Sequence, residues 1–246
     1  MQRSPTEACS LPAMERRLNE LDWPAFEERL FEEGHVLERG VLDAGDCAEL
    51  AAMFERDELF RSTVNMQAHG FGRGEYRYFR YPLPLAIQTL RETLYAGLAP
   101  IANRWMEALR LPDRFPATQQ ALFDLCAARG QRRPTALLLR YDRGDWNALH
   151  QDLYGEIAFP FQATVFLSSP GEDFTGGEFV LVEQRPRAQS RPHVVVPERG
   201  SMLIFANRYR PVKGKSGTYR TVVRHGVSRL HDGRRFALGI IFHDAK

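Results

Sequence analysis

The chain has 246 residues, of which 43% are hydrophobic and 11% aromatic, and its 33 basic and 31 acidic side chains leave a net charge of +2. This length and apolar content can bury a substantial core, which excludes a disordered chain. No apolar run approaches the roughly 20 residues that cross a bilayer, and the N-terminus lacks the apolar stretch of a secretory signal. We therefore expect a folded cytoplasmic protein with no membrane partner.

The charge is divided unevenly along the chain. Residues 1–125 hold 14 Arg and 20 acidic residues, whereas residues 126–246 hold 19 Lys or Arg and 11 acidic residues. A basic excess of this kind attracts phosphates, although basic loops are also often merely solvated. Nucleic acid is therefore a possible partner of the C-terminal half.

The first 130 residues have mainly helical patterns. Apolar residues recur at three- and four-residue spacing in four segments, with Asp43 as an N-cap of the second. These segments are Phe26–Gly34, Ala44–Glu58, Leu85–Leu109 and Pro116–Ala128. The stretch 35–42 ("HVLERGVL") indicates a short strand. We expect residues 1–130 to be a mainly helical support region with one or two strands.

From Thr135 onward the pattern changes to short β-branched and aromatic runs separated by Gly, Pro and Asp. Seven such runs occur, at 135–141, 161–168, 177–183, 193–197, 201–207, 219–227 and 234–243. They predict an antiparallel unit of seven or eight strands, a barrel or jelly roll. We expect an α+β protein in which residues 131–246 form the catalytic core, the helices cover one sheet, and the whole is one integrated domain.

An H-x-D triplet precedes one of these runs. On an extended chain His150 and Asp152 point to the same face. A third ligand must return from far along the chain, and His225, which follows 73 residues after Asp152 at the end of a strand, is the candidate. Two histidines and one carboxylate hold Fe(II) on one face and leave positions open. A lone histidine is more often a structural residue, so the triplet by itself is weak evidence.

A basic pair, Arg234 and Arg235, opens the last strand. Alternation places Arg235, Ala237 and Gly239 on one face of the strand. The large side chains lie on the other face, namely Phe236, Leu238, Ile240 and Phe242. One face then packs against helices and the other lines a site. A guanidinium inside a barrel needs a carboxylate partner, which a dicarboxylic cosubstrate supplies. Alternation does not decide which of the two arginines points inward.

Several motifs resemble the Fe(II)- and 2-oxoglutarate-dependent dioxygenases of the prolyl-hydroxylase-like branch. They are "LLRYDRGDWNALHQD", "GGEFVL", "PERGSMLIF", "RHGVS" and "GRRFAL", in this order. The resemblance implies a double-stranded β-helix in which His150, Asp152 and His225 bind Fe(II). It also implies that Arg235, ten positions after the distal histidine, binds the distal carboxylate of 2-oxoglutarate and that Tyr141 assists. Ala237 departs from relatives that have a hydroxyl residue there.

A closer resemblance extends over most of the chain. "GFGRGEYRYFRYPLP", "LHQDLYGE", "DFTGGEFVLVEQRPRAQSR" and "RHGVSRL" look like a bacterial family of these oxygenases described as acting on damaged, alkylated DNA. It implies that O2 and 2-oxoglutarate are consumed while a substrate is hydroxylated or oxidatively demethylated. A hydroxylase of a protein side chain, an amino acid or a small molecule is the alternative. A barrel of this fold without enzymatic activity is a third reading, which the intact ligand set disfavours.

Two groups of residues are predicted to contact the substrate. The loop "EQRPRAQSRP" has the composition of a lid or binding loop, and its Arg185, Arg187 and Arg191 would recognise the substrate. The second group consists of aromatic side chains that could stack on a flipped or single-stranded base, namely Phe71, Tyr76, Tyr78 and Phe79. Two further histidines of the C-terminal half, His231 and His243, are expected at the surface.

Overall fold

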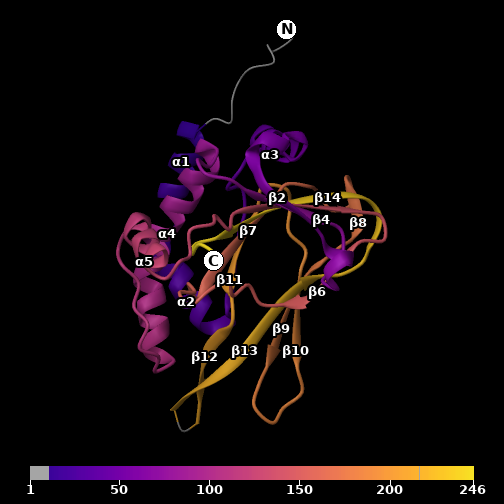
Figure 1. The fold of residues 1–246 in the computed structure, drawn as a ribbon. Coiled ribbons are helices and arrows are strands. Elements are labelled where there is room, and N and C mark those ends of the chain that lie inside the picture. The colour runs from indigo at the N-terminus through magenta and orange to yellow at the C-terminus, as the bar shows by residue number, and fades with distance from the viewer. Residues whose placement is uncertain (1–10, 216) are drawn as a thin grey trace.

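Two antiparallel β-sheets face each other in the computed structural model, which describes residues 11–215 and 217–246 (Figure 1). The large sheet has eight strands in the order β1-β11-β7-β14-β5-β4-β2, with β8 beside β14. The small sheet has six strands in the order β10-β9-β13-β6-β3, with β12 beside β13. The strands are β1 (His35–Glu38), β2 (Phe60–Asn65), β3 (Gly72–Arg73), β4 (Glu75–Phe79), β5 (Leu137–Asp142), β6 (Trp146–His150), β7 (Phe161–Phe166), β8 (Phe174–Gly176), β9 (Phe179–Gln184), β10 (Arg191–Val195), β11 (Met202–Ala206), β12 (Tyr209–Gly214), β13 (Gly217–Val227) and β14 (Leu230–Ile241).

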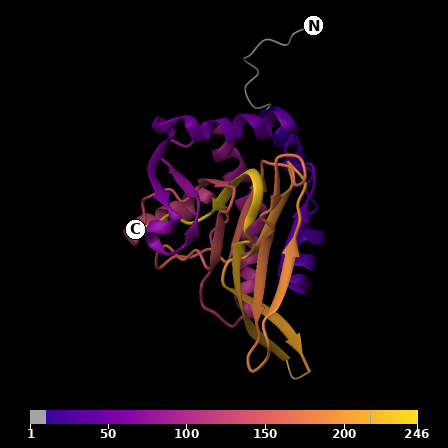
Figure 2. The ribbon, with the colours of Figure 1, turned by 90° about the vertical axis from the view of Figure 1, so that its right-hand side faces the viewer.

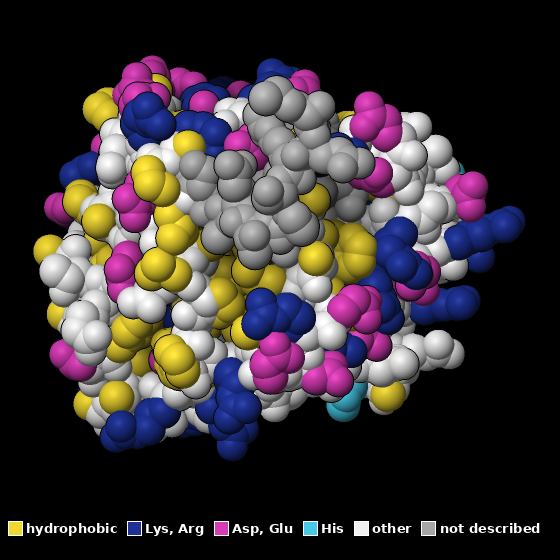
Figure 3. All heavy atoms as spheres, turned by 90° about the horizontal axis from the view of Figure 1, so that it is seen from above, with side chains coloured by type: hydrophobic (Ala, Val, Ile, Leu, Met, Phe, Trp, Pro, Cys, Tyr) yellow, Lys and Arg dark blue, Asp and Glu magenta, His cyan; other side chains and the backbone are white. Residues whose placement is uncertain are grey.

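In Figure 1, α1, α2, α4 and α5 lie to the left of the paired sheets, whereas α3 lies above them, and the view turned by 90° also shows helices along the top (Figure 2). They are α1 (Leu11–Asn19), α2 (Trp23–Glu33), α3 (Ala44–Ala52), α4 (Leu85–Ala108) and α5 (Gln119–Ala128). None of the helices in the described residues combines the length and the apolar composition that spanning a bilayer requires. On the face seen from above, basic and acidic side chains are interspersed, so the positive charge of this face is interrupted (Figure 3).

Helix boundaries follow local capping. The carboxylate of Asp43 accepts the backbone N–H of Asp46, and Asp46 returns the bond, which completes the predicted cap of α3 as a capping box. The prediction that this helix reaches Glu58 is wrong, because it ends at Ala52 and two short 3₁₀ turns follow, Met53–Glu55 and Asp57–Leu59. The turns bring the rings of Phe54 and Phe60 into one cluster, with centroids 6.4 Å apart.

The strand count exceeds the expectation in both halves. Among the described residues, four strands lie before position 131 rather than one or two, and ten strands follow rather than seven or eight. Periodicity does not predict most strands of the first half because they are short, and Gly70, Gly72 and Gly74 interrupt the pattern around β3. Gly72, with φ 127°, lets β3 approach β6 so closely that a β-carbon there would collide with the carbonyl oxygen of Trp146.

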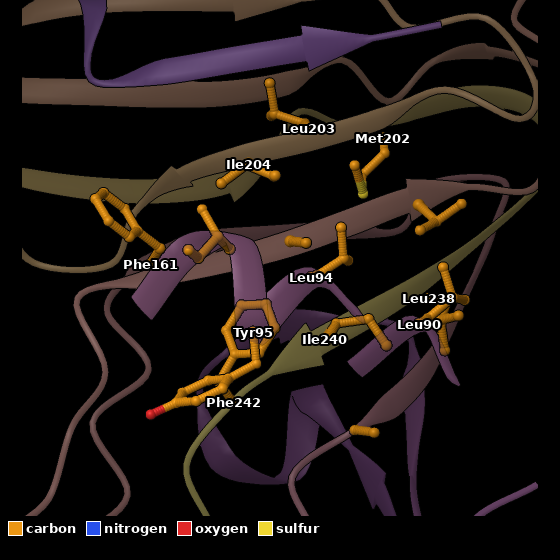
Figure 4. Packing of buried hydrophobic residues seen from close by; sticks show 14 of the residues in the cluster. Leu90, Leu94, Tyr95, Phe161, Met202, Leu203, Ile204, Leu238, Ile240 and Phe242 are labelled. Carbon is orange, nitrogen blue, oxygen red and sulfur yellow. The ribbon is translucent and has the colours of Figure 1, made fainter. Parts of the chain in front are cut away.

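The core lies between α4 and the large sheet. Leu238, Ile240 and Phe242 pack against Leu90 and Tyr95 of α4 (Figure 4). The opposite face of β14 carries Arg235, Ala237 and Gly239, which line a cavity between the sheets. The alternation expected for this strand is therefore present, and it separates a packing face from a site-forming face.

Two buried ion pairs connect the helices to the sheets. Arg91 of α4 contacts Asp244 at 2.9 Å and also donates to backbone carbonyls of Ile241 and Phe242. Arg210 of β12 pairs with Glu183 of β9 and donates to the carbonyl of Glu32 at the end of α2. Both arginines thus satisfy carbonyl groups as well as a carboxylate.

Candidate metal centre

Three side chains with metal-binding atoms meet in the small sheet. His150 ends β6, Asp152 follows two residues later, and His225 on β13 is the Cα partner of His150. One ligand atom of each residue lies within 4.8 Å of the other two. The antiparallel pairing of β6 with β13 therefore brings together His150 and His225, which are 75 positions apart in the sequence.

A hydrogen bond fixes the orientation of His150. Its Nδ1 lies 2.7 Å from the carbonyl oxygen of Ala148, which can only accept. Nδ1 therefore carries the proton, and Nε2 presents its lone pair toward Asp152, whose Oδ1 is 3.6 Å away. Metal-binding histidines usually have their second nitrogen bonded in this way.

Asp152 is held by its neighbours on several sides. Its backbone N–H donates to Asn207 Oδ1 at 3.0 Å, and the amide of Asn207 donates back to the Asp152 carbonyl at 2.6 Å. The Tyr154 hydroxyl donates to Oδ1 at 2.5 Å, while Oδ2 faces His225 Nε2 at 3.3 Å. The orientation of the carboxylate is thus set by the protein itself.

The protonation states of the site suit a metal. Burial raises the pKa of Asp152, but the hydrogen bond from His225 and the charges that the two histidines acquire in acid outweigh burial and hold the pKa well below its usual range. Burial and the charge of His150 lower the pKa of His225 to about 4, against the opposing effect of Asp152. At neutral pH the site offers an anionic carboxylate and a neutral His225 imidazole, the forms that bind metal.

The large sheet adds polar groups from the other side. Gln162 of β7 places its Nε2 3.0 Å from His225 Nε2, and its buried Oε1 has no hydrogen-bond partner among the described residues. Thr164, on the same face of β7, also lines the cavity. Sequence reasoning missed Gln162, as it missed Tyr154 and Asn207, because each is an ordinary polar residue until the fold aims it at the ligands.

Arg235 occupies another part of the same cavity. Its side chain is only 2% exposed and forms no ion pair with any residue in the described ranges. Three rings surround the guanidinium, those of Tyr141, Phe166 and Phe174, at 5.3, 5.6 and 6.0 Å from their centroids. Burial lowers the pKa of Arg235, and the nearby Tyr141 only partly opposes this. A buried cation without a carboxylate is costly, so the position calls for an anionic ligand.

Tyr141 lies beside this guanidinium. It is the Cα partner of Arg235, and its hydroxyl accepts a hydrogen bond from Asn147 Nδ2 at 3.3 Å. Burial raises the pKa of Tyr141 to about 12, which the charge of Arg235 opposes. The hydroxyl therefore keeps its proton at neutral pH and can donate to an anion.

The cavity that joins these groups has a volume of about 360 Å³. Its walls include the three candidate metal ligands, Arg235 and Tyr141. The candidate metal ligands and the Arg235 guanidinium therefore face one cavity, whose volume lies within the usual size range of ligand sites.

The remaining sequence-derived candidates are divided. Phe71 and Tyr76 line the cavity, whereas Phe79 is fully buried in the core and cannot stack on a base. Tyr78 is 8% exposed and donates a hydrogen bond to Tyr154 at 3.0 Å. The loop arginines do not line the cavity, since Arg185 and Arg187 lie in the β9–β10 connection and Arg191 begins β10.

One prediction about the other histidines is wrong. His231 is exposed, but His243 is fully buried, and its Nδ1 accepts the backbone N–H of Phe159 at 3.1 Å. The residues that follow β14 are held against α4, because Arg91 of α4 donates to the carbonyl of Phe242 and pairs with Asp244, and His243 lies between these two residues. Burial lowers the pKa of His243 to about 4.

Comparison with known families and proteins gives a consistent result. A family model described as "Oxygenase, catalysing oxidative methylation of damaged DNA" matches residues 74–245. Uncharacterised proteins from two strains of Mycobacterium tuberculosis are 48% identical over 167 residues, which cover 68% of this chain and 72% of theirs.

Solved structures share the fold at low identity. A prolyl-4-hydroxylase from Pseudomonas putida aligns with a TM-score of 0.52 and 15% identity over 89% of this chain and 96% of its own. An oxidoreductase of the 2OG-Fe(II) oxygenase family from Burkholderia pseudomallei aligns with a TM-score of 0.54 and 18% identity over 92% and 94%. These similarities concern the arrangement of helices and sheets.

Proposed function

We propose that this chain, which belongs to the oxygenase family described as acting on damaged DNA, is a dioxygenase that depends on Fe(II) and 2-oxoglutarate. Its substrate would be alkylated nucleic-acid bases, which it would hydroxylate or oxidatively demethylate. The observation that carries the proposal is the joint cavity, in which an H-x-D…H ligand set and a buried guanidinium without a partner carboxylate face one space.

The donor set fits Fe(II). Two imidazoles and one carboxylate are the ligands of the facial triad, which leaves further positions for cosubstrate and O2. His150, Asp152 and His225 would hold the ion, with the proton of His150 directed to the Ala148 carbonyl and Asp152 steadied by Tyr154. The bound metal supplies the activation of O2, coupled to the conversion of 2-oxoglutarate into succinate and carbon dioxide.

The pocket residues fit a dicarboxylate. Arg235 would receive the distal carboxylate in a charge-assisted pair, and the protonated Tyr141 would donate to the same group. Position 237 has no hydroxyl, but Thr164, on the adjacent strand β7, lines the same cavity and would supply a hydroxyl there. Gln162 would face the keto-acid end, because its amide lies beside His225.

We assign the facing sheets to a double-stranded β-helix core within residues 131–246, supported by residues 1–130 as parts of one integrated catalytic domain. The support is the antiparallel pairing of the strands and the position of the cavity between the two sheets. β2, β3 and β4 extend these sheets from the N-terminal half. Cys47 and Cys126 are buried free thiols, as expected of a protein in the reducing cytoplasm.

The substrate chemistry follows from an oxygenase of this kind. Hydroxylation of an N-methyl carbon gives a hemiaminal, whose C–N bond breaks to release formaldehyde and the unmodified base. The protein's part is to hold the methyl carbon near the metal and to exclude water, with Phe71 and Tyr76 in the walls. Hydroxylation of a protein side chain, an amino acid or a small molecule is the second candidate, because the fold is shared with a prolyl-4-hydroxylase.

The first experiment tests metal and cosubstrate together. Fe(II) and then 2-oxoglutarate are added anaerobically to the wild type, to Asp152→Ala and to Asp232→Ala, an exposed aspartate that serves as control, and the visible absorption of the metal–keto-acid complex is followed. We expect the band in the wild type and in Asp232→Ala and its loss in Asp152→Ala. A wild type that binds Fe(II) but shows no band contradicts the proposal.

The second experiment addresses the substrate. Formaldehyde and succinate are measured after incubation with methylated and unmethylated oligonucleotides. Formaldehyde released only from the methylated strand supports demethylation of bases. Succinate formation stimulated by peptides or small molecules, and by no oligonucleotide, would favour the second candidate.

A further inference from the structure

We propose that a rim beside the cavity mouth, formed by Phe71, Arg73, Arg143, Trp146 and Arg229, is a binding track for single-stranded nucleic acid. This inference rests on the proposed function and deepens it, because it names the surface that would deliver a base to the cavity. A base must leave its stack to reach an enclosed site, so a single strand or a flipped nucleotide is the form to be held.

The rim exposes large aromatic side chains. Phe71 lines the cavity yet is 49% exposed, and its ring lies parallel to that of His69, with centroids 5.4 Å apart. Trp146, at the start of β6, is 43% exposed. Exposed rings of this kind are stacking platforms for bases and accept any sequence, since every base has a π-face.

Arginines are interleaved with these rings. Arg73 is the Cα partner of Trp146 across β3 and β6. Arg73 Nη1 and Arg229 Nη2 converge over Gly144, at 3.7 and 3.9 Å from the point that a β-carbon would occupy there. The adjacent Arg143 is also exposed. Together they form a cluster of guanidinium groups at the β5–β6 turn.

The positive charge of the rim is only partly compensated. Arg73 contacts Asp145 at 3.0 Å, but this carboxylate is mostly buried, with 11% of its side chain exposed. Arg143 and Arg229 form no ion pair with any residue that the structure describes. Guanidinium groups that are exposed and unpaired are available to bind phosphates.

The rim is continuous with the metal centre. The backbone N–H of Ala148 donates to the Phe71 carbonyl at 2.9 Å, two residues before His150. Trp146 and His150 are four residues apart on one strand, which places them roughly 13 Å from each other. Nucleotides stacked on the rim would therefore flank the one that enters the cavity.

The structure favours this rim over the β9–β10 loop as the phosphate-binding surface. In the small sheet β10 and β3 form opposite edges, so Arg185, Arg187 and Arg191 belong to the edge away from the rim. In Figure 1 the β9–β10 connection lies at the lower end of the molecule, whereas β6 lies above it. The two groups have the same number of arginines and can be compared directly.

The test compares two triple variants, Arg73→Gln/Arg143→Gln/Arg229→Gln in the rim and Arg185→Gln/Arg187→Gln/Arg191→Gln in the loop. Binding of a fluorescent single-stranded oligonucleotide to the enzyme loaded with Mn(II) and 2-oxoglutarate is measured by anisotropy over a range of salt concentrations. For the rim variant we expect affinity to fall about tenfold or more at low salt and the log–log salt slope to decrease by about 2. The loop variant should stay within about twofold of the wild type.

A separate variant isolates stacking. Trp146→Leu keeps an apolar side chain and should weaken binding about fivefold or more without changing the salt slope. The Fe(II)–2-oxoglutarate band serves as the folding control, because Trp146 and the rim arginines do not line the cavity.

The outcomes separate this inference from the proposed function. If the loop variant loses affinity while the rim variant does not, the rim is not the track, although nucleic acid stays the substrate. If the wild type shows the metal–cosubstrate band but binds no oligonucleotide, the rim and the nucleic-acid substrate both fail and only the oxygenase chemistry stands. An acidic peptide that binds in place of the oligonucleotide would likewise overturn the rim's assignment.

Discussion

Replacing Arg235 by Met should change stability and cosubstrate binding in opposite directions. The guanidinium is 2% exposed and has no carboxylate partner in the described residues, so the metal-free protein carries the cost of a buried charge. The nearby rings recover on the order of 2 kcal/mol by cation–π contact, less than the cost of desolvating the charge. Methionine fills a similar volume without charge, and apolar replacement of buried charges stabilises proteins by up to about 4 kcal/mol. We expect Arg235→Met to raise the free energy of unfolding by about 1–3 kcal/mol.

The cosubstrate should reverse the order of stability. With Mn(II) bound and 2-oxoglutarate at about 100 times its Kd, the wild type gains about 2.7 kcal/mol, whereas the variant without the anchoring cation should gain little. Urea unfolding followed by tryptophan fluorescence, with and without 2-oxoglutarate, measures both effects.

Arg91→Met is the matched control for this experiment. Arg91 is equally buried, at 1% exposed, but pairs with Asp244 at 2.9 Å. Its removal leaves that carboxylate buried and should destabilise the protein by about 3–5 kcal/mol. If Arg235→Met is destabilised to the same degree, or gains as much from 2-oxoglutarate as the wild type, Arg235 is not an anion anchor.

Two further predictions concern stability. The pKa of His243 is lowered by burial from 6.5 to about 4, so between these pH values the unfolded chain takes up a proton that the folded protein excludes. The free energy of unfolding should therefore fall by about 3 kcal/mol for this group as the pH drops through this window. Urea titrations of His243→Gln should show a correspondingly shallower dependence of the free energy of unfolding on pH. An equal pH dependence in the variant and the wild type would refute this. Glu183→Gln leaves Arg210 buried without its carboxylate and should lower the free energy of unfolding by about 3 kcal/mol. Glu156→Gln, at an exposed pair with Arg129, should lower it by less than about 1 kcal/mol. Similar losses of stability in the two variants, measured by thermal or urea unfolding, would contradict the role of burial.

The sequence predicted what depends on periodicity. The four helical segments correspond to α2, α3, α4 and α5, and each of the seven β-like runs overlaps a strand, although most boundaries differ by a few residues. α1 and the short strands β2, β3, β4, β6, β8 and β12 were not predicted, because their residues have no regular alternation or are stabilised only by pairing with distant strands.

The candidate site divides in the same way. The H-x-D spacing and the distal histidine are visible in the sequence because ligand chemistry restricts them to a few residue types. The orienting groups Tyr154, Asn207 and Gln162 have no such restriction, and their roles depend on contacts across 2, 55 and 63 positions of sequence. The sequence also does not reveal the cluster of rim arginines, because Arg73 and Arg229 are far apart in the chain and meet only in the fold, beside Gly144.

The two ends of the cavity depend on different parts of the molecule. His150 and His225 come from the small sheet, whereas Arg235 and Tyr141 come from adjacent strands of the large sheet, whose opposite face packs on α4. A change in the packing of α4, such as Leu94→Ala, should therefore shift the strand that carries Arg235 more than the metal ligands. If Arg235 is the carboxylate anchor that we propose, α4 would set the position of this anchor relative to His150, Asp152 and His225, although α4 itself contributes none of these residues.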